Sequence, residues 1–232
     1  MHMVCVRRES VRQAGNRSMP IGERPHPVRI VVTGTSGAGK TTFARRVATA
    51  LGIPHIELDA LNWQPGWRAL SIDDPQLFAR HVAEAVAADR WVSDGNYGLV
   101  REIIWSRATH LVWLDYGRPV VMARVLRRSF VRAVLRTELW PGTGNSERWR
   151  AWFRPSHPIR WAWSTWARRR RETAERLKRP EFAHLVVLRV AHPRQAPAAL
   201  HALRASRTAT DHPRGEDTEA TRLEVPADPR AG

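Results

Sequence analysis

The feature that most constrains the fold is an eight-residue segment, Gly34-Thr35-Ser36-Gly37-Ala38-Gly39-Lys40-Thr41. It fits the pattern G-x-x-x-x-G-K-[ST], whose backbone N–H groups cradle phosphates while the Lys reaches the β- and γ-phosphates and the Thr hydroxyl binds Mg²⁺. Of 38 basic residues only two are lysines, Lys40 and Lys178. A compact ammonium suits this position better than the broad guanidinium fork. The segment therefore predicts binding of a nucleoside triphosphate.

The residues on either side of this loop meet the structural requirements of the motif. Residues 28 to 33 form a β-branched run that predicts a strand. Beyond the loop, Phe43, Val47 and Leu51 recur at helical spacing, and Gly52-Ile53-Pro54 ends that pattern. A strand before the loop and a helix after it favour a phosphate-binding loop over a glycine-rich turn that binds nothing.

Short apolar runs alternate with helical patterns along the rest of the chain. Strands are predicted near residues 28 to 33, 54 to 58, 90 to 94, 109 to 115 and 183 to 189. Such alternation predicts an α/β fold with a parallel sheet covered by helices on both faces. Ligands bind beyond the carboxyl ends of the strands in sheets of this kind.

Three of the predicted strands end in an aspartate, so these carboxylates are expected on the same rim as the phosphate loop: Asp59, Asp94 and Asp115. Carboxylates there can hold the water shell of Mg²⁺ or accept a proton from the attacking group. Asp94 ranks first, because the following glycine allows close approach of a ligand. Asp59 ranks second. Asp115 ranks third, since a strand-end aspartate also commonly caps a helix or starts a turn.

Composition sets the domain organisation and the compartment. A chain of 26.5 kDa with 43% hydrophobic residues can build one sizeable core. We expect a disordered extension over residues 1–27, one domain over 28–205 and a disordered tail over 206–232, with Met19 as an alternative start. Cys5 is the single cysteine, which excludes an intrachain disulfide and favours a cytoplasmic location. The sequence shows neither a membrane-spanning run nor a secretory signal.

The formal net charge of +16 offers a second interpretation, binding to nucleic acid. The chain shows no helix-turn-helix, zinc-finger or RNA-binding signature. An arginine-rich composition around a site for a multiply charged nucleotide is therefore the favoured interpretation.

Two arginine-rich regions follow the fourth predicted strand. Arg124, Arg128, Arg132 and Arg136 recur every four residues on a predicted helix, opposite an apolar row of Met122, Leu126, Phe130 and Val134 that is expected to pack on the core. Like charges at this spacing cost about 0.2 to 0.5 kcal/mol per pair, which favours a facing anion for part of the row. Residues 136 to 171 then hold six of the eleven tryptophans. This segment could stack single-stranded bases, but a mobile lid over about 137–171 is favoured.

The order of several motifs resembles small P-loop proteins known as DNA topology modulation proteins, which are related to adenylate kinase. The shared elements include the phosphate loop, residues 58 to 67 with Trp63 and Trp67, residues 91 to 97, residues 138 to 142 and the run Arg168 to Arg171. This resemblance implies a three-layer α/β/α P-loop NTPase fold with a five-stranded parallel sheet in the order 2-3-1-4-5. In adenylate kinases, the sequence Phe-Pro-Arg follows an Asp-Gly pair, and its arginine binds the acceptor phosphate. In this chain Asn96-Tyr97-Gly98 follows the pair, so that arginine is absent at this position. Arg101 lies one turn further on.

The predicted function is transfer of the γ-phosphoryl group of ATP to a small acceptor, with a nucleoside monophosphate as one candidate acceptor. The alternative is a P-loop ATPase associated with DNA or RNA. The predicted catalytic residues are Lys40, Asp94, Asp59, Arg128 and Arg170, and the predicted Mg²⁺ ligands are Thr41 and Asp94. The predicted ATP-binding residues are Gly34, Thr35, Ser36, Gly37, Ala38, Gly39, Lys40, Thr41, Thr42 and Arg124.

Overall fold

The computed structural model describes residues 26–135, 138–140, 143–146, 158–210 and 223–224. Six strands of these residues form a parallel sheet in the order β10-β9-β6-β1-β5-β2. The strands are β1 (Val28–Gly34), β2 (His55–Glu57), β5 (Arg90–Asp94), β6 (His110–Leu114), β9 (Val186–Val190) and β10 (Leu223–Glu224). The first five correspond to the five predicted strands, and their spatial order is the predicted 2-3-1-4-5.

The central strands are nearly continuous apolar runs because helices cover both of their faces. Every residue of β1 except Arg29 is buried. The register between β1 and β5 pairs Val32 with Asp94, and the register between β1 and β6 pairs Gly34 with Leu114. The carboxyl ends of the three strands therefore meet at one edge, where the phosphate loop begins. The α/β fold with three layers is confirmed.

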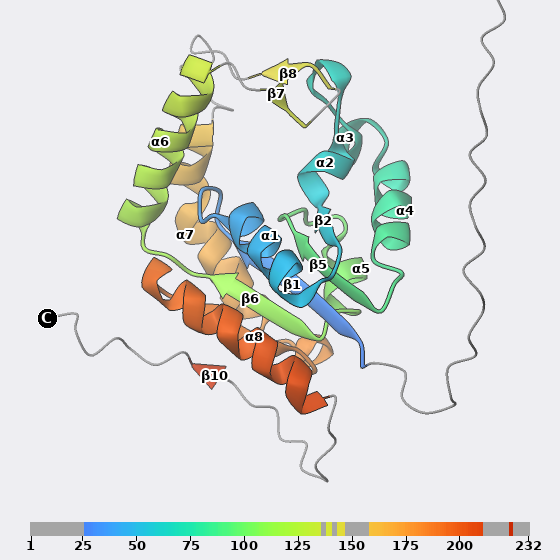
Figure 1. Ribbon diagram of the computed structural model, residues 1–232. Coiled ribbons are helices and arrows are strands. Elements are labelled where there is room, and N and C mark those ends of the chain that lie inside the picture. Colours follow the sequence, from blue (N-terminus) through green and yellow to red (C-terminus); the bar gives the residue numbers. More distant parts are fainter. Residues whose placement is uncertain (1–25, 136–137, 141–142, 147–157, 211–222, 225–232) are drawn as a thin grey trace, which may run out of the picture.

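Helices α1 (Lys40–Leu51) and α8 (Ala196–Thr210) cover one face of the sheet, and α4 (Pro75–Ala85) and α5 (Arg101–Trp105) cover the other. Two longer helices, α6 (Arg118–Leu135) and α7 (Pro158–Arg176), lie against each other beside the sheet (Figure 1). Two separate apolar cores result, one between the sheet and α1 and one between the sheet and α4. Their most buried members include Ile30, Val32 and Val47 on the first side and Phe78, Val82 and Trp91 on the second.

Small elements lie above the carboxyl edge of the sheet. After β2 come α2 (Leu58–Asn62), β3 (Trp63–Gln64), the 3₁₀ turn η1 (Pro65–Trp67), β4 (Arg68–Ala69) and α3 (Leu70–Asp73). After α6 comes the antiparallel pair β7 (Glu138–Leu139) and β8 (Asn145–Ser146). Two further 3₁₀ turns, η3 (Pro180–Phe182) and η4 (Pro193–Gln195), flank β9. The pair β7–β8 reaches across to the β3–η1 region in Figure 1.

The predicted domain end differs from the structure, and parts of both predicted terminal segments fall outside the described residues. Helix α8 continues to Thr210, past the predicted domain end at 205, because Ala199 and Leu203 pack in the core and keep the helix on the sheet. Residues 223 and 224 of the predicted tail pair with β9. Residues 1–25 of the predicted extension, like 211–222 and 225–232, lie outside the described residues.

The second half of the predicted lid is a core helix. Residues 158 to 171 belong to α7, whose Ala162 and Thr165 are buried. Of the first half, residues 136–137, 141–142 and 147–157 lie outside the described residues. The lid therefore stays a prediction only for the stretch between α6 and α7.

The packing of α6 also differs from the prediction. Leu126 is 47% exposed and Phe130 is 61% exposed, whereas Val121, Val125 and Ser129 are buried. The prediction that the apolar row faces the core is therefore wrong for Leu126 and Phe130, whereas Met122 of the same row is partly buried against the core. The helix has apolar residues on two adjacent rows, and the phosphate loop packs on the row with Val121 and Val125, so that row is buried.

Among the helices that the structure describes, none is long and apolar enough to cross a membrane.

Candidate active site

The phosphate loop connects β1 to α1 and has no room for side chains at two of its glycines. A Cβ on Gly37, whose φ is +86°, would lie 2.2 Å from Cγ2 of Val125. A Cβ on Gly34, whose φ is +149°, would lie 2.7 Å from the carbonyl oxygen of Leu114. L-residues rarely adopt such backbone angles, so glycine is required on both steric and conformational grounds. The loop thus has the tight backbone of a phosphate cradle.

Lys40 is the first residue of α1, and its Nζ donates a hydrogen bond to the carbonyl oxygen of Thr35 at 3.2 Å. Burial lowers the pKa of Lys40 below its ordinary value of 10.5, and the nearby carboxylates of Asp94 and Asp59 partly offset this. The positive charges of Arg128 and Arg169 lower the pKa of Lys40 further. Two carboxylates and three cations therefore lie close to one another at the loop.

Asp94 is the last residue of β5 and is buried between the loop and β2. Its Oδ2 accepts a hydrogen bond of 2.6 Å from the hydroxyl of Thr41, and its Oδ1 lies 2.6 Å from Nε2 of His55. The structure thus brings together the two predicted Mg²⁺ ligands. Mg²⁺ is usually held by one or two carboxylates, water and substrate phosphates, so a hydroxyl and a carboxylate in contact fit this ion.

The protein alone does not assemble a larger metal site. Across the described ranges, no three His, Cys, Asp or Glu side chains gather in a way that could hold a metal ion. The hydroxyl of Thr35, buried in the loop, has no hydrogen-bond partner among the described residues. It can therefore donate to a phosphate.

Asp59 is at the start of α2, where its Oδ1 accepts a 2.6 Å hydrogen bond from the hydroxyl of Tyr97. Burial, together with the negative charge of Asp59, raises the pKa of Tyr97 far above its ordinary value. Tyr97 therefore stays protonated and keeps donating to Asp59, while the second carboxylate oxygen remains able to accept another bond. Asp59 thus belongs to α2, whereas Asp94 is the aspartate that contacts Thr41.

Asp115 has a different role from the other two aspartates. Its side chain is 0% exposed, and Oδ2 accepts hydrogen bonds from Arg170 Nη2 at 2.9 Å and from Arg189 Nη2 at 2.7 Å. These contacts tie α7 and β9 to the end of β6. Asp115 was the lowest-ranked of the three predicted aspartates, and a structural role fits its position.

The prediction of Arg170 as a catalytic residue is not supported by this geometry. Its guanidinium is bound to Asp115 through both Nε and Nη2 and lies over the ring of Trp166, 4.7 Å from the centroid. The side chain is thus fixed on a buried carboxylate that it shares with Arg189. The positive charge of the neighbouring Arg169 instead contributes to lowering the pKa of Lys40. The sequence of the run Arg168 to Arg171 does not indicate that Arg169 and Arg170 have different partners.

Arg124 lies directly on the loop. Its Nη1 donates to the carbonyl oxygen of Ala38 at 2.8 Å, and its guanidinium lies over the ring of Tyr116, 4.9 Å from the centroid. Arg128, one turn later, is close enough for its charge to lower the pKa of Lys40. Both predicted residues therefore lie beside the loop. Arg132 lies on α6 with its side chain outside the described part, and Arg136 lies outside the described residues.

Several residues at the site were not found from the sequence. His55 contacts Asp94 because it is in the strand next to β5, and its register partner is Val92, two residues before Asp94. Glu57 accepts hydrogen bonds from Arg45 at 2.9 Å and from the indole of Trp140 at 3.3 Å. A histidine and a glutamate two residues apart in a predicted strand before Asp59 were the only available signal.

Three tryptophans meet above the site. The rings of Trp63 and Trp140 are stacked at 5.9 Å between centroids, and Trp67 contacts both edge-on at 5.7 and 6.2 Å. The cluster joins the region after β7 to the β3–η1 region. The remaining loop residues Ser36 and Thr42 lie at the loop, with Thr42 exposed.

The chain is similar to parts of small-molecule kinases. It is 45% identical over 75 residues to a cytidylate kinase of Nitratidesulfovibrio vulgaris (strain DP4), a match that covers 31% of this chain and 30% of that protein. It is 33% identical over 112 residues to a shikimate kinase of Corynebacterium efficiens, covering 43% of this chain and 63% of that protein. The matches thus span less than two thirds of each relative. No family model matches the chain.

Solved structures with a similar arrangement are also kinases. A gluconokinase from Sinorhizobium meliloti 1021 is aligned with a TM-score of 0.45 and 24% identity over 82% of this chain and 100% of that chain. A shikimate kinase from Bacteroides thetaiotaomicron is aligned with a TM-score of 0.47 and 16% identity over 77% of this chain and 97% of that chain. The fold assignment rests on the sheet order and the phosphate loop described above. The relation to DNA topology modulation proteins stays a prediction from the sequence.

Proposed function

We propose that this protein is an ATP-dependent kinase that transfers the γ-phosphoryl group of ATP to a small-molecule acceptor. The observation that carries the proposal is the contact between Thr41 of the phosphate loop and Asp94 of the neighbouring strand. It combines a phosphate cradle with a carboxylate that can hold the water shell of Mg²⁺. The partial matches to cytidylate kinase and shikimate kinase support the same class of reaction.

The donor side of the site consists of the loop and three basic residues. In the proposed complex, the backbone N–H groups and Lys40 hold the β- and γ-phosphates, and Thr41 and Asp94 hold Mg²⁺, which neutralises part of the phosphate charge. Arg128 and Arg169 add positive charge close to Lys40. Arg124 keeps the loop in place through the carbonyl oxygen of Ala38. Catalysis of this kind is mostly positioning and charge stabilisation.

The acceptor side is proposed to lie toward Asp59 and Tyr97. An oxygen of the acceptor forms a bond to the γ-phosphorus while the bond to the β–γ bridging oxygen breaks, and ADP leaves with that electron pair. If the acceptor group is a hydroxyl, its proton needs a base. Asp59 is suited to this task, because Tyr97 occupies only one of its two carboxylate oxygens.

The test is ATP consumption in the presence of a panel of nucleosides, nucleoside monophosphates, sugar acids and small alcohols, with acceptor-independent hydrolysis as the control. We expect one class of acceptor to stimulate ADP formation and to gain one phosphoryl group by mass. Lys40→Ala should abolish this turnover. Lys178→Ala is the matched control, because Lys178 is exposed and its ammonium pairs with the exposed Glu175. Full activity in Lys40→Ala would refute the proposal.

A further inference from the structure

His55 of β2 forms a hydrogen bond to the carboxylate that the proposed function assigns to Mg²⁺. Its Nε2 lies 2.6 Å from Oδ1 of Asp94. The side chain of His55 is 14% exposed and that of Asp94 is 4% exposed, so the contact is shielded from water. Hydrogen bonds to charged groups are stronger than those between neutral groups, and burial strengthens them further because water does not compete for either partner. This contact therefore holds the carboxylate in one orientation.

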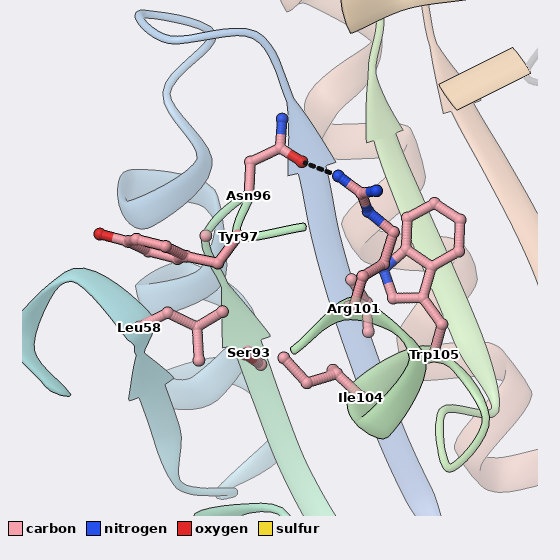
Figure 2. A pocket seen from close by; sticks show the side chains of 9 residues that line it. Leu58, Ser93, Asn96, Tyr97, Arg101, Ile104 and Trp105 are labelled. Carbon is pink, nitrogen blue, oxygen red and sulfur yellow. Dashed lines mark hydrogen bonds between the residues drawn. The ribbon is translucent and has the colours of Figure 1, made fainter. Parts of the chain in front are cut away.

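The pairing of the strands explains why these two side chains meet. Successive residues of a strand point to opposite faces of a sheet. Figure 2 shows Ser93 on the face where Ile104 of α5 lies. The next residue, Asp94, therefore points to the opposite face, which α1 covers. His55 is paired with Val92, which packs in the core on the α1 side, so the imidazole lies on the same face as the carboxylate.

Asp94 is held through both of its oxygens. Oδ1 takes the bond from His55, and Oδ2 accepts the 2.6 Å hydrogen bond from the hydroxyl of Thr41. A carboxylate only accepts hydrogen bonds, so both neighbours must donate to it. Nε2 of His55 therefore carries a proton, and the hydrogen of the Thr41 hydroxyl points at Asp94. The two acceptor lone pairs of that hydroxyl are then directed away from the carboxylate.

This orientation of the hydroxyl is the one that a cation bound to Thr41 requires. Mg²⁺ binds oxygen lone pairs in near-ideal octahedral geometry, so a hydroxyl whose hydrogen pointed at the ion could not be a ligand. Without the bond from His55, the carboxylate of Asp94 can rotate about its side-chain torsions, and its bond to the hydroxyl is no longer fixed. Removing a group that orients metal ligands in this way typically costs about 10- to 100-fold in metal affinity or activity.

A second side chain of β2 contacts α1 beside this chain of hydrogen bonds. Glu57 is two residues after His55 and therefore lies on the same face of the sheet. Its Oε2 accepts a 2.9 Å hydrogen bond from Arg45, which is four residues after Thr41 on α1. The side chain of Arg45 is 65% exposed, and exposed ion pairs contribute little to stability. The buried contact of His55 is therefore the stronger of the two contacts that β2 forms next to Thr41.

We propose that His55 is a positioning residue of the phosphoryl-transfer site, whose Nε2–H fixes Asp94 so that Asp94 orients the hydroxyl of Thr41 for Mg²⁺. This inference rests on the proposed kinase function and adds a residue to it. His55 acts only through Asp94, so its loss should weaken the Mg²⁺-dependent part of nucleotide binding. The contacts of the phosphate loop with the nucleotide should be unaffected.

The first experiment measures binding of a non-hydrolysable ATP analogue to the full chain by calorimetry, with and without Mg²⁺. His55→Leu removes the donor, whereas His55→Gln keeps an N–H donor near the position of Nε2. We expect His55→Leu to need at least about tenfold more Mg²⁺ for half-maximal binding and to bind the metal-free analogue like the wild type. His55→Gln should restore most of the lost affinity. His201→Leu, on the exposed face of α8, is the control and should behave like the wild type.

The second experiment detects the hydrogen bond itself. Nuclear magnetic resonance of ¹⁵N-labelled histidine side chains should show a proton on Nε2 of His55 that exchanges slowly with water. Asp94→Asn should shift the signal of this proton, because a neutral amide is a weaker acceptor than a carboxylate. Thermal unfolding verifies that the variants fold. If His55→Leu does not fold, His55→Asn decides, because its side chain is one bond too short to place an N–H at the position of Nε2.

The outcomes distinguish this inference from the function on which it rests. If the wild type binds the analogue with Mg²⁺ and His55→Leu shows the same Mg²⁺ dependence, the inference is wrong while the kinase proposal stands. Equal losses with and without Mg²⁺, no restoration in His55→Gln, or an Nε2 of His55 without a proton would overturn it in the same way. If the wild type does not bind the analogue, or binds it equally well without Mg²⁺, the proposed function fails and the inference fails with it.

Discussion

Asp115→Asn is the substitution that best separates a structural carboxylate from a catalytic one. The side chain of Asp115 is 0% exposed, while those of Arg170 and Arg189 are 35% and 48% exposed. Breaking a fully buried ion pair costs about 3 to 5 kcal/mol, and the partial exposure of both arginines reduces that cost. Asparagine keeps one acceptor oxygen but turns an N–H donor toward a guanidinium. We therefore expect a loss of about 3 kcal/mol in the free energy of unfolding.

For a domain of this size, 1 kcal/mol corresponds to about 2 to 4 °C in Tm, so the expected decrease is about 6 to 12 °C. The assay is thermal and urea unfolding of wild type and Asp115→Asn. Asp89→Asn is the control, because Asp89 is exposed and lies 3.6 Å from Arg29, and its effect should stay under about 0.5 kcal/mol.

Activity completes the test. At a temperature at which Asp115→Asn is folded, its kcat and KM should stay within about threefold of wild type, because the carboxylate contacts α7 and β9 rather than the loop. An unchanged Tm with a hundredfold lower kcat would refute the reasoning, would support the predicted catalytic role of Arg170 and would add Asp115 to the catalytic residues.

Three further predictions concern the site itself. An NMR titration of the ¹³C-dimethylated protein should show a pKa below 10.5 for Lys40, and Asp94→Asn should lower the pKa of Lys40 further by removing an attractive charge. Between the pKa of Lys40 in the folded protein and its higher value in the unfolded chain, the unfolded chain binds more protons. The free energy of unfolding should therefore rise with pH across that window, while affinity for ATP falls as the ammonium is lost. A Lys40 pKa above 10.5 would contradict this. Asp94→Asn should lower kcat/KM about 10- to 100-fold and raise the Mg²⁺ concentration for half-maximal rate, and an unchanged Mg²⁺ dependence would argue against the assigned role. Trp140→Ala removes two ring contacts of about 0.5 to 1.5 kcal/mol each. Hydrogen exchange of the backbone amides of residues 143–146 should therefore accelerate by about five- to a hundredfold. Unchanged exchange would show that the tryptophan cluster does not hold this region.

The sequence was sufficient for the parts of the fold that depend on local chemistry. The glycines at 34 and 37 can be placed from sequence because no other residue fits a loop of that shape. The five strands were found because both faces of the sheet are covered, which requires long apolar runs. Asp94 could be ranked first because it ends a predicted strand and a glycine follows it directly.

Long-range side-chain choices could not be found in the same way. Arg169 and Arg170 are adjacent in sequence, yet the charge of one lowers the pKa of Lys40 and the other binds Asp115, which depends on the rotation of α7. The burial of Val125 rather than Leu126 likewise depends on where the loop meets α6. These are properties of packing between distant segments, and a single sequence carries no periodic signal for them.

The central claim is that the loop from Gly34 to Thr41 binds a magnesium-bound nucleoside triphosphate through Lys40. Calorimetric titration of MgATP into the folded protein tests it most directly. One molecule should bind per chain, binding should be lost in Lys40→Ala, and Lys178→Ala should bind as the wild type does. Folded wild-type protein that gives no heat of binding, or Lys40→Ala with unchanged affinity, would contradict the account.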